Sequence, residues 1–209
     1  MFEYGVDMVD AFQSSLFEST PGLAPLTAAT RVPLTDGAWL DVLPGWLAAT
    51  GDLFTRLVDT VPWHAERRQM YDSVVGVPRL LAFYREGAPL PDPILLAAKE
   101  ALSAHYATPF VTAGLCLYRD GADSVAWHGD RIGRGAHSDT FVAIVSLGAT
   151  RPLLLRPRDG GKSRRVPLAH GDLVVMGGSC QRTWDHAVPK VRERTGARIS
   201  VQFRPAGVR

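Results

Sequence analysis

Cysteine and lysine are scarce in this chain, and it has no long apolar run. Its two cysteines, Cys116 and Cys180, are too few for a disulfide framework and lack the paired spacing of a zinc knuckle. We expect both to be reduced and to serve packing. Pro, Gly or charged residues break every apolar stretch well before the roughly 18 residues that a membrane span needs. No basic segment followed by an apolar core opens the sequence. These features predict a cytoplasmic protein with no membrane segment.

The net charge is only +2, which excludes a strong general attraction to polyanions. The basic residues are unevenly distributed, and residues 151–165 gather several of them around a turn at 159–161, where Asp159 is the only acid. A basic hairpin tip of this kind can contact phosphates, but a solvated charged loop explains the pattern equally well. The basic side chains of this segment are Arg151, Arg156, Arg158, Lys162, Arg164 and Arg165.

Length and composition fit one globular domain. The chain has 209 residues, of which 46% are apolar and 21% charged, as in ordinary soluble proteins. We expect a single domain over residues 1–209 and favour a monomer. We divide it into an N-terminal extension with a helix (1–64), a middle segment with a helix (65–107) and a β-rich core (108–207).

The first half of the sequence has the pattern of helices. Residues 43–61 carry apolar side chains at helical spacing, among them Trp46 and Leu47, and the pattern ends before Pro62. A second helix is expected after Asp92, which is suited to be its N-cap, with Pro93 in the first turn.

The residue pattern changes from helix-like to strand-like after about residue 108. Short runs rich in β-branched and apolar residues follow one another, separated by Gly, Asp, Ser and Pro turns. They predict an α+β, mainly β fold: a double-stranded β-helix, or jelly roll, with the N-terminal helices packed outside. The expected strands are 110–118, 141–147, 152–155, 172–176 and 198–203.

The last of these strands has one wholly polar face. Side chains alternate along a strand, so Arg198, Ser200, Gln202 and Arg204 share a face while the apolar residues between them share the other. Guanidinium groups match carboxylates with two parallel hydrogen bonds, which suits a dicarboxylate ligand. An edge strand with its polar face in water is the alternative interpretation.

Two histidines and an aspartate have the pattern of an iron site. His128 and Asp130 flank Gly129 at the end of a strand-like segment, residues 124–128, and His186 follows a predicted strand and turn at 171–178. Two imidazoles and a carboxylate can occupy one face of an octahedral Fe(II) ion and leave three positions open. The other histidines, at positions 64, 105, 137 and 170, are interpreted as surface or packing residues, with His64 and His105 in or beside helices.

Together these motifs resemble the AlkB family of Fe(II)- and 2-oxoglutarate-dependent dioxygenases. The resemblance covers about residues 65–207 and is carried in order by residues 118–130, 146–148, 170–178, His186 and 198–204. It implies a jelly-roll enzyme that uses Fe(II), 2-oxoglutarate and O2. It also implies oxidative dealkylation of alkylated nucleobases in DNA or RNA, with release of succinate, CO2 and an aldehyde. Nucleic acid is then the expected partner.

The resemblance also implies residue roles. His128, Asp130 and His186 match the iron ligands. Arg198 matches the arginine that pairs with the distal carboxylate of 2-oxoglutarate, and Arg204 a second arginine near the cosubstrate's other end or the substrate. Tyr118, Ser146 and Ser200 match the cosubstrate pocket, and residues 65–107 match a nucleotide-recognition lid. The expected substrate residues are Met70, Tyr71, Tyr84, Trp127, Arg131, Arg182 and Trp184.

Two positions depart from the family pattern. Cys116 replaces a common asparagine, which weakens or replaces one hydrogen bond to the cosubstrate. Arg131 follows Asp130 where several members carry acidic residues, and its charge disfavours a cationic methylated base while attracting phosphate or a neutral adduct. Two alternatives therefore stay open: a 2-oxoglutarate oxygenase acting on a small molecule or protein, and a non-catalytic metal-binding jelly roll.

Overall fold

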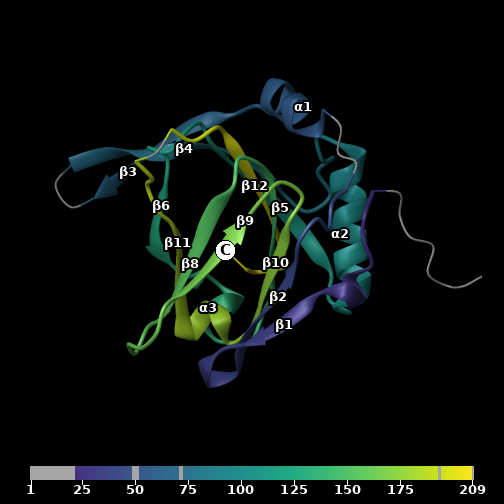
Figure 1. The fold of residues 1–209 in the computed structure, drawn as a ribbon, viewed down its shortest axis with the longest axis vertical. Helices are drawn as coiled ribbons and strands as arrows, with labels where there is room; N and C mark the ends of the chain where they lie inside the picture. Colours follow the sequence, from purple (N-terminus) through teal and green to yellow (C-terminus); the bar gives the residue numbers. More distant parts are fainter. Residues whose placement is uncertain (1–21, 49–51, 71–72, 193, 209) are drawn as a thin grey trace, which may run out of the picture.

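Two antiparallel β-sheets face each other in the computed structural model, which describes residues 22–48, 52–70, 73–192 and 194–208 (Figure 1). The major sheet has the strand order β1-β2-β10-β7-β12-β5-β4-β3, and the minor sheet β6-β11-β8-β9. The strands are β1 (Thr30–Pro33), β2 (Ala38–Leu43), β3 (His64–Met70), β4 (Ser73–Tyr84), β5 (Phe110–Tyr118), β6 (Val125–His128), β7 (Val142–Gly148), β8 (Arg151–Pro157), β9 (Arg164–Leu168), β10 (Leu173–Gly178), β11 (Trp184–Val188) and β12 (Arg198–Pro205). The helices are α1 (Leu53–Thr60), α2 (Pro93–His105) and α3 (Cys180–Thr183), with 3-10 turns η1 (Leu26–Ala28), η2 (Thr35–Gly37) and η3 (Arg134–Ala136).

The apolar side chains form two layers, one on each face of the major sheet. The outer layer joins β5, β7, β10 and β12 to α1 and α2, which cover this face (Figure 1). The inner layer lies between the two sheets and includes Ile144 and Met176 from the major sheet and Leu155 from the minor one. The jelly-roll architecture predicted from the sequence, with helices packed outside, is confirmed.

Strand β12 lies in the middle of the major sheet, between β7 and β5. Its apolar residues Ile199, Val201 and Phe203 point into the outer layer beneath the helices. The polar face predicted from the alternation therefore points between the sheets. The alternative of an edge strand facing water is wrong.

The first half of the chain contains more sheet than its sequence pattern indicated. Strands β1 and β2 extend the major sheet beyond β10, and β4 continues it beyond β5. The helix expected over 43–61 begins only at Leu53, although it ends before Pro62 as predicted. Trp46 and Leu47 are buried, but in a turn whose Gly45 N–H donates to the Asp172 carboxylate at 2.8 Å. A tertiary contact has overridden the helical spacing there.

Helix α2 begins as the sequence predicted. The Asp92 carboxylate accepts a hydrogen bond from the Ile94 N–H at 3.0 Å, and Pro93 occupies the first turn. Arg56 of α1 reaches the same carboxylate at 2.8 Å, so the cap also joins the two helices.

The segment predicted to resemble a recognition lid begins with a long hairpin. Strands β3 and β4 pair antiparallel and extend the major sheet, and their far end projects away from the body of the protein (Figure 1). Met70 ends β3, but its side chain lies outside the described residues, as does Tyr71. Their predicted contacts with a substrate therefore stay predictions.

Arg151 is not part of the basic hairpin tip. Its side chain is buried and donates to the backbone carbonyls of Asp120, Asp123 and Pro189. It ties the loop after β5 to the end of β11. The remaining basic residues of the segment lie along the β8–β9 hairpin and are exposed.

The same loop contains a testable ion pair. Burial alone would raise the pKa of Asp123, but hydrogen bonds from the Arg119 guanidinium and backbone N–H outweigh it and lower this pKa below 3.8. A carboxylate whose pKa is lower in the folded protein than in the unfolded chain stabilises the fold when the pH is above the unfolded-state pKa. This stabilisation is lost as the pH falls through the folded-state pKa. Asp123→Asn is therefore expected to cost about 1 kcal/mol at neutral pH, since Arg119 is half-exposed.

This difference should shrink in acid. Urea unfolding of the wild type and of Asp123→Asn, compared at neutral pH and below the ordinary aspartate pKa, measures it. Asp159→Asn in the exposed hairpin turn is the control. A difference that stays constant with pH would contradict the assignment.

Both cysteines are free thiols, as predicted; Cys180 is buried in the inner layer. Within the described part of the chain, no helix is both long and apolar enough to cross a membrane.

Candidate active site

The two predicted histidine ligands lie directly opposite each other. His128 of β6 and His186 of β11 form a register pair across adjacent antiparallel strands, so their side chains leave the minor sheet on the same face. Their ring centroids are 4.3 Å apart. With Asp130 they offer ligand atoms that all lie within 4.8 Å of one another. The structure thus brings together the three side chains that the sequence singled out.

Asp130 is held by a close turn after β6. Its N–H donates to the side-chain oxygen of buried Gln181 at 2.9 Å. Gly129, between the two ligands, lies so close to α3 and its end that a Cβ there would come within 2.8 Å of the Gln181 carbonyl oxygen. Neither contact was recognised from the sequence, because Gln181 is far from Gly129 along the chain.

We expect Gly129→Ala to weaken metal binding by about 10–100-fold, the range seen when a hydrogen-bonded support of a metal ligand is lost. The added methyl group must push the turn away from Gln181, which displaces Asp130. Titration with Co(II), followed by its absorption bands, measures the affinity. Gly196→Ala, where a Cβ meets only ordinary contact distances, is the control; equal affinities in all three proteins would refute the role of Gly129.

The protonation states suit a cation bound at this point. Burial, His128 and Arg204 together lower the pKa of His186 to about 3, although Asp130 opposes them, so the imidazole is neutral. Burial would raise the pKa of Asp130, but the charge of Arg204 and its hydrogen bond outweigh this effect and lower the pKa. The Nδ1 atom of His128 lies 2.9 Å from the Ala126 carbonyl oxygen, to which it must donate, and this leaves Nε2 as the ligand atom.

Arg204 belongs to the metal centre as much as to the cosubstrate pocket. Its Nε donates to Asp130 Oδ2 at 2.6 Å, and both side chains are mostly buried. The sequence placed Arg204 near the end of the cosubstrate opposite its distal carboxylate, or near the substrate. The structure adds an ion pair that fixes the carboxylate of a predicted ligand.

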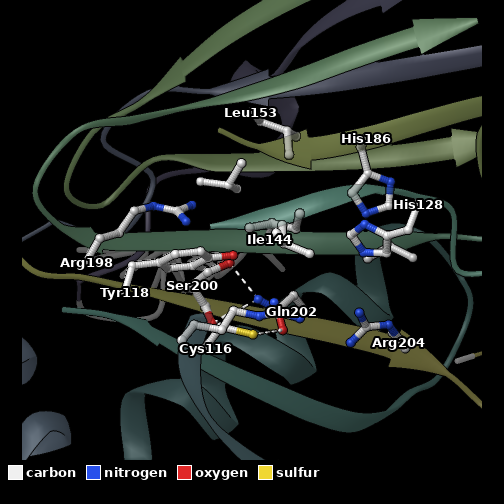
Figure 2. Close-up of a pocket in the computed structure, with 14 residues that line it drawn as sticks. Cys116, Tyr118, His128, Ile144, Leu153, His186, Arg198, Ser200, Gln202 and Arg204 are labelled. Atoms are coloured by element: carbon white, nitrogen blue, oxygen red, sulfur yellow. Dashed lines mark hydrogen bonds between the residues drawn. The ribbon is translucent and has the colours of Figure 1, made fainter. Parts of the chain in front are cut away.

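A pocket extends from the two histidines along the polar face of β12 (Figure 2). Arg198 closes its inner end and Arg204 its outer end, while His128 and His186 form one side. Tyr118, Ser200 and Gln202 point into it from β5 and β12. Its apolar wall consists of Val125, Val142, Ile144, Leu153 and Val188.

Arg198 is a buried cation in need of an anion. It is 1% exposed, and among the described residues no carboxylate pairs with it. Its Nε donates to Ser146 Oγ at 2.8 Å, its guanidinium carbon lies 5.3 Å from the Tyr118 ring centroid, and its Nη1 has no hydrogen-bond partner. A carboxylate reaching the inner end of the pocket would satisfy this nitrogen.

The remaining polar residues of the pocket are linked to one another. The Gln202 side-chain nitrogen donates to Ser200 Oγ at 2.6 Å, and the Cys116 thiol lies 3.7 Å from the Gln202 side-chain oxygen. Burial, with a smaller contribution from Cys116, raises the pKa of Tyr118 to about 12, although the neighbouring arginines lower it. The phenol therefore stays protonated and can donate a hydrogen bond. Gln202 was not assigned a role from the sequence, although its place on the polar face could have indicated one.

Several predicted substrate residues lie elsewhere. Tyr84 packs in the outer apolar layer, on the other face of the major sheet from the pocket. Trp184 is buried in the inner layer but is not among the residues that line the pocket. Trp127 lies on the outer face of the minor sheet, because it precedes His128 and strand side chains alternate. Arg182 pairs with Asp139, and Arg131 points toward Asp185.

Phe83 takes the position expected for Tyr84. It is 54% exposed and lines a second cavity that shares Arg204 with the first. Arg79, which the sequence placed in the lid segment, lines the first pocket. Register explains the exchange: Phe83 pairs with Gly114, which pairs with Gln202 on the polar face.

The other histidines are outside the site. His170 has the same spacing to an aspartate as His128, but its Nδ1 accepts from the Gly148 N–H, while Asp172 accepts from Gly45 and Ala169. His105 ends α2 as expected, whereas His64 begins a strand, not a helix.

Comparison with known proteins shows the family of the chain. Residues 82–204 match the family model described as the 2OG-Fe(II) oxygenase superfamily. The chain belongs to this superfamily. The match spans more than half of the chain and contains the histidine pair, Asp130, Arg198 and Arg204. Membership implies Fe(II), 2-oxoglutarate and O2, and the three clustered ligands and the unpaired Arg198 fit them.

Relatives support the narrower resemblance to AlkB proteins. The chain is 32% identical over 186 residues to "Alpha-ketoglutarate-dependent dioxygenase alkB homolog 3" of Bos taurus, covering 77% of this chain and 64% of that protein. It is 30% identical over 120 residues to "DNA oxidative demethylase ALKBH2" of Homo sapiens, covering 54% and 46%. The chain thus spans less than two thirds of these relatives. The solved structure of OsALKBH1 shares the fold, with a TM-score of 0.60 and 16% identity over 84% of this chain and 100% of that one.

Proposed function

We propose that this chain is an Fe(II)- and 2-oxoglutarate-dependent dioxygenase that oxidatively removes alkyl groups from nucleobases in DNA or RNA. The observation that carries the proposal is the juxtaposition of three ligand atoms within 4.8 Å and, along the same pocket, a buried guanidinium with an unpartnered nitrogen. A structural metal site needs no such cation. The arrangement therefore favours an enzyme over a non-catalytic metal-binding jelly roll.

Each pocket residue has a distinct task in this proposal. His128, Asp130 and His186 hold the iron, and Arg204 keeps Asp130 ionised and oriented. Arg198 binds the distal carboxylate of 2-oxoglutarate, with Ser146 fixing the guanidinium. Tyr118 and Ser200 donate hydrogen bonds to cosubstrate oxygens, and Gln202 with Cys116 stands where a direct amide contact is common in the family.

When bound, Fe(II) and 2-oxoglutarate supply the oxidation of a substrate C–H bond by O2, with release of succinate and CO2. The protein positions the target carbon and excludes water. The apolar wall formed by Ile144, Leu153 and Val188 keeps water out of the pocket. Hydroxylation of a carbon attached to nitrogen gives a hemiaminal, which breaks down to an aldehyde and the unmodified base.

The second cavity offers room for the base. Phe83 presents an exposed ring there, on which an extruded base can stack, and Arg204 joins this cavity to the metal centre. The names of the relatives, which include a DNA oxidative demethylase, support a nucleic-acid substrate.

A screen of alkylated oligonucleotides tests the proposal. Purified protein with Fe(II), 2-oxoglutarate and O2 should release succinate and aldehyde in equal amounts from a methylated or etheno-containing strand, with matching mass loss. Single- and double-stranded DNA and RNA are compared, with the unmodified strand as control. Succinate formation that no alkylated strand stimulates would refute the nucleic-acid assignment.

A second candidate keeps the cofactors and changes the substrate to a small molecule or a protein side chain. It is favoured by the lack of an acidic residue at position 131, where several family members carry one against a cationic base. Preferential turnover of neutral etheno adducts over cationic methylated bases would reconcile Arg131 with nucleic acid. Turnover of neither, together with succinate formation on another amine or side chain, would favour this second candidate.

A further inference from the structure

Three arginines surround one aspartate on the outer face of the minor sheet. The side chains of Arg131, Arg156 and Arg158 lie 3.8, 3.6 and 3.9 Å from the carboxylate of Asp185. We call Arg131, Arg156 and Arg158 the arginine cluster. It combines the segment after Asp130 with β8, two parts of the chain that the sequence did not connect.

The cluster has uncompensated positive charge and hydrogen-bond donors that Asp185 does not use. Three guanidinium groups face a single carboxylate, so two positive charges remain. All three separations exceed hydrogen-bond length, and the buried Asp185 Oδ1 has no hydrogen-bond partner. The arginine side chains are 39–46% exposed, whereas Asp185 is 15% exposed. The guanidinium N–H groups therefore remain accessible to an anion from solution.

Packing orients the cluster. The Arg156 guanidinium carbon lies 4.4 Å from the Trp127 ring centroid, a cation–π contact that limits its freedom. Arg158 donates from Nη1 to the Arg182 carbonyl oxygen at 3.1 Å. Arg156 is also the register partner of Asp185. Less side-chain freedom is then left to lose when a ligand binds.

The cluster is on the reverse side of the strands that carry the metal ligands. Asp185 precedes His186 and Trp127 precedes His128, so each pair points to opposite faces of the sheet. β6 is an edge strand of the minor sheet, and Arg131 lies next to Asp130 at its end. The cluster and the site therefore lie back to back across the minor sheet, next to its β6 edge.

We propose that the arginine cluster binds backbone phosphates of the nucleic-acid strand whose alkylated nucleotide enters the metal site. This rests on the proposed function. A phosphodiester carries one negative charge and presents acceptor oxygens that guanidinium groups bind in pairs. The cluster positions the strand and does not read its bases, so it acts on affinity and not on the choice of lesion. Arg131 serves this cluster instead of contacting the base.

Salt dependence of binding tests the cluster. We measure the anisotropy of a fluorescein-labelled, unmodified single-stranded oligonucleotide with the metal-free protein over a range of salt concentrations. Arg156→Gln/Arg158→Gln should weaken binding at low salt by about tenfold or more. Each lost contact with a single strand should reduce the slope of log K against log salt by about 0.7, so the double variant should lose about 1.4. Unchanged affinity and slope would overturn the proposal.

Two further variants separate local binding from general charge or folding. Lys99→Gln/Arg192→Gln removes two positive charges elsewhere; Lys99 lies on α2, across the molecule from β8 and β11 (Figure 1). This variant should keep nearly the wild-type salt slope. A loss of slope equal to that of Arg156→Gln/Arg158→Gln would show that net charge, and not the cluster, causes the effect. Asp185→Asn removes the carboxylate that the cluster surrounds and should tighten binding several-fold. Weaker binding by a folded Asp185→Asn protein would overturn the proposal.

Neutral linkages in the strand locate the contact. An oligonucleotide with one methylphosphonate linkage, moved stepwise away from an alkylated base, should bind the wild type more weakly at one or two positions. Arg156→Gln/Arg158→Gln should not respond to those positions. Loss at no position, or equal loss in both proteins, would refute a phosphate contact by the cluster.

Turnover separates the two proposals. If the wild type dealkylates the strand and the double variant binds with the same affinity and salt slope, the proposed function stands and the role of the cluster is refuted. If the wild type binds through the cluster but dealkylates no strand, the role of the cluster stands and the proposed function is refuted. An alkylated nucleoside, which has no phosphate, should be turned over equally by the wild type and the double variant.

Discussion

His128→Ala is expected to reduce 2-oxoglutarate turnover by more than about 100-fold. Even the loss of a hydrogen-bond partner of a metal ligand typically costs about 10–100-fold, and here the ligand itself is removed. The remaining Asp130 and His186 leave one side of the ion without a protein ligand. Succinate formation with Fe(II) and an alkylated strand measures the effect.

The fold should tolerate this change, because His128 ends an edge strand and is only partly buried. Far-ultraviolet circular dichroism and a Co(II) titration distinguish lost metal binding from lost structure. His105→Ala, at the exposed end of α2, is the matched control and should keep full turnover. A folded His128→Ala protein with wild-type turnover would exclude the proposed iron site.

Arg198→Met is expected to raise the KM for 2-oxoglutarate by about 100-fold. A hydrogen bond to a charged group contributes about 1.5–3 kcal/mol, so losing the guanidinium costs about 3 kcal/mol of cosubstrate binding. Methionine approximates the length of the aliphatic stem and fills the buried space. Initial rates of succinate formation at varied 2-oxoglutarate concentrations measure the change, with Arg192→Met on the exposed loop before β12 as control.

The same variant should behave differently without the cosubstrate. Burial lowers the pKa of Arg198, which shows that the charged form is poorly solvated there. Removing an unpaired buried charge should therefore leave the free protein as stable as the wild type or more so. Saturating 2-oxoglutarate with Co(II) should raise the thermal midpoint of the wild type by several degrees and that of Arg198→Met much less. Equal cosubstrate stabilisation of both would contradict the assignment of Arg198.

Local pattern accounts for much of the site. The alternation in β12 placed Arg198, Ser200, Gln202 and Arg204 on one face, and the structure shows that this face lines the pocket. His128 and Asp130 sit around a strand end as their spacing suggested. The β-rich second half and the start of α2 also followed from turn residues, capping and apolar periodicity, because these signals act over a few neighbouring residues.

Local pattern failed where distant strands set the outcome. The helical pattern of residues 43–48 was overridden by the end of β2 and by the contact between Gly45 and Asp172. Tyr84 and Phe83 exchanged their expected places because pairing with β5 decides which of two adjacent aromatics faces the site. Trp184 was expected near the substrate; it shares the inner face of the minor sheet with His186 but is not among the residues that line the pocket.

The sequence by itself determined the candidate ligand set, the polar face of β12 and the class of fold, since each depends on residue type and short-range periodicity. Only the tertiary structure decided that Arg204 pairs with Asp130, that Arg198 is buried without a carboxylate among the described residues, and that three arginines share Asp185. Those contacts join residues from separate strands. Their geometry is set by sheet register and by the packing of one sheet on the other, which no local pattern specifies.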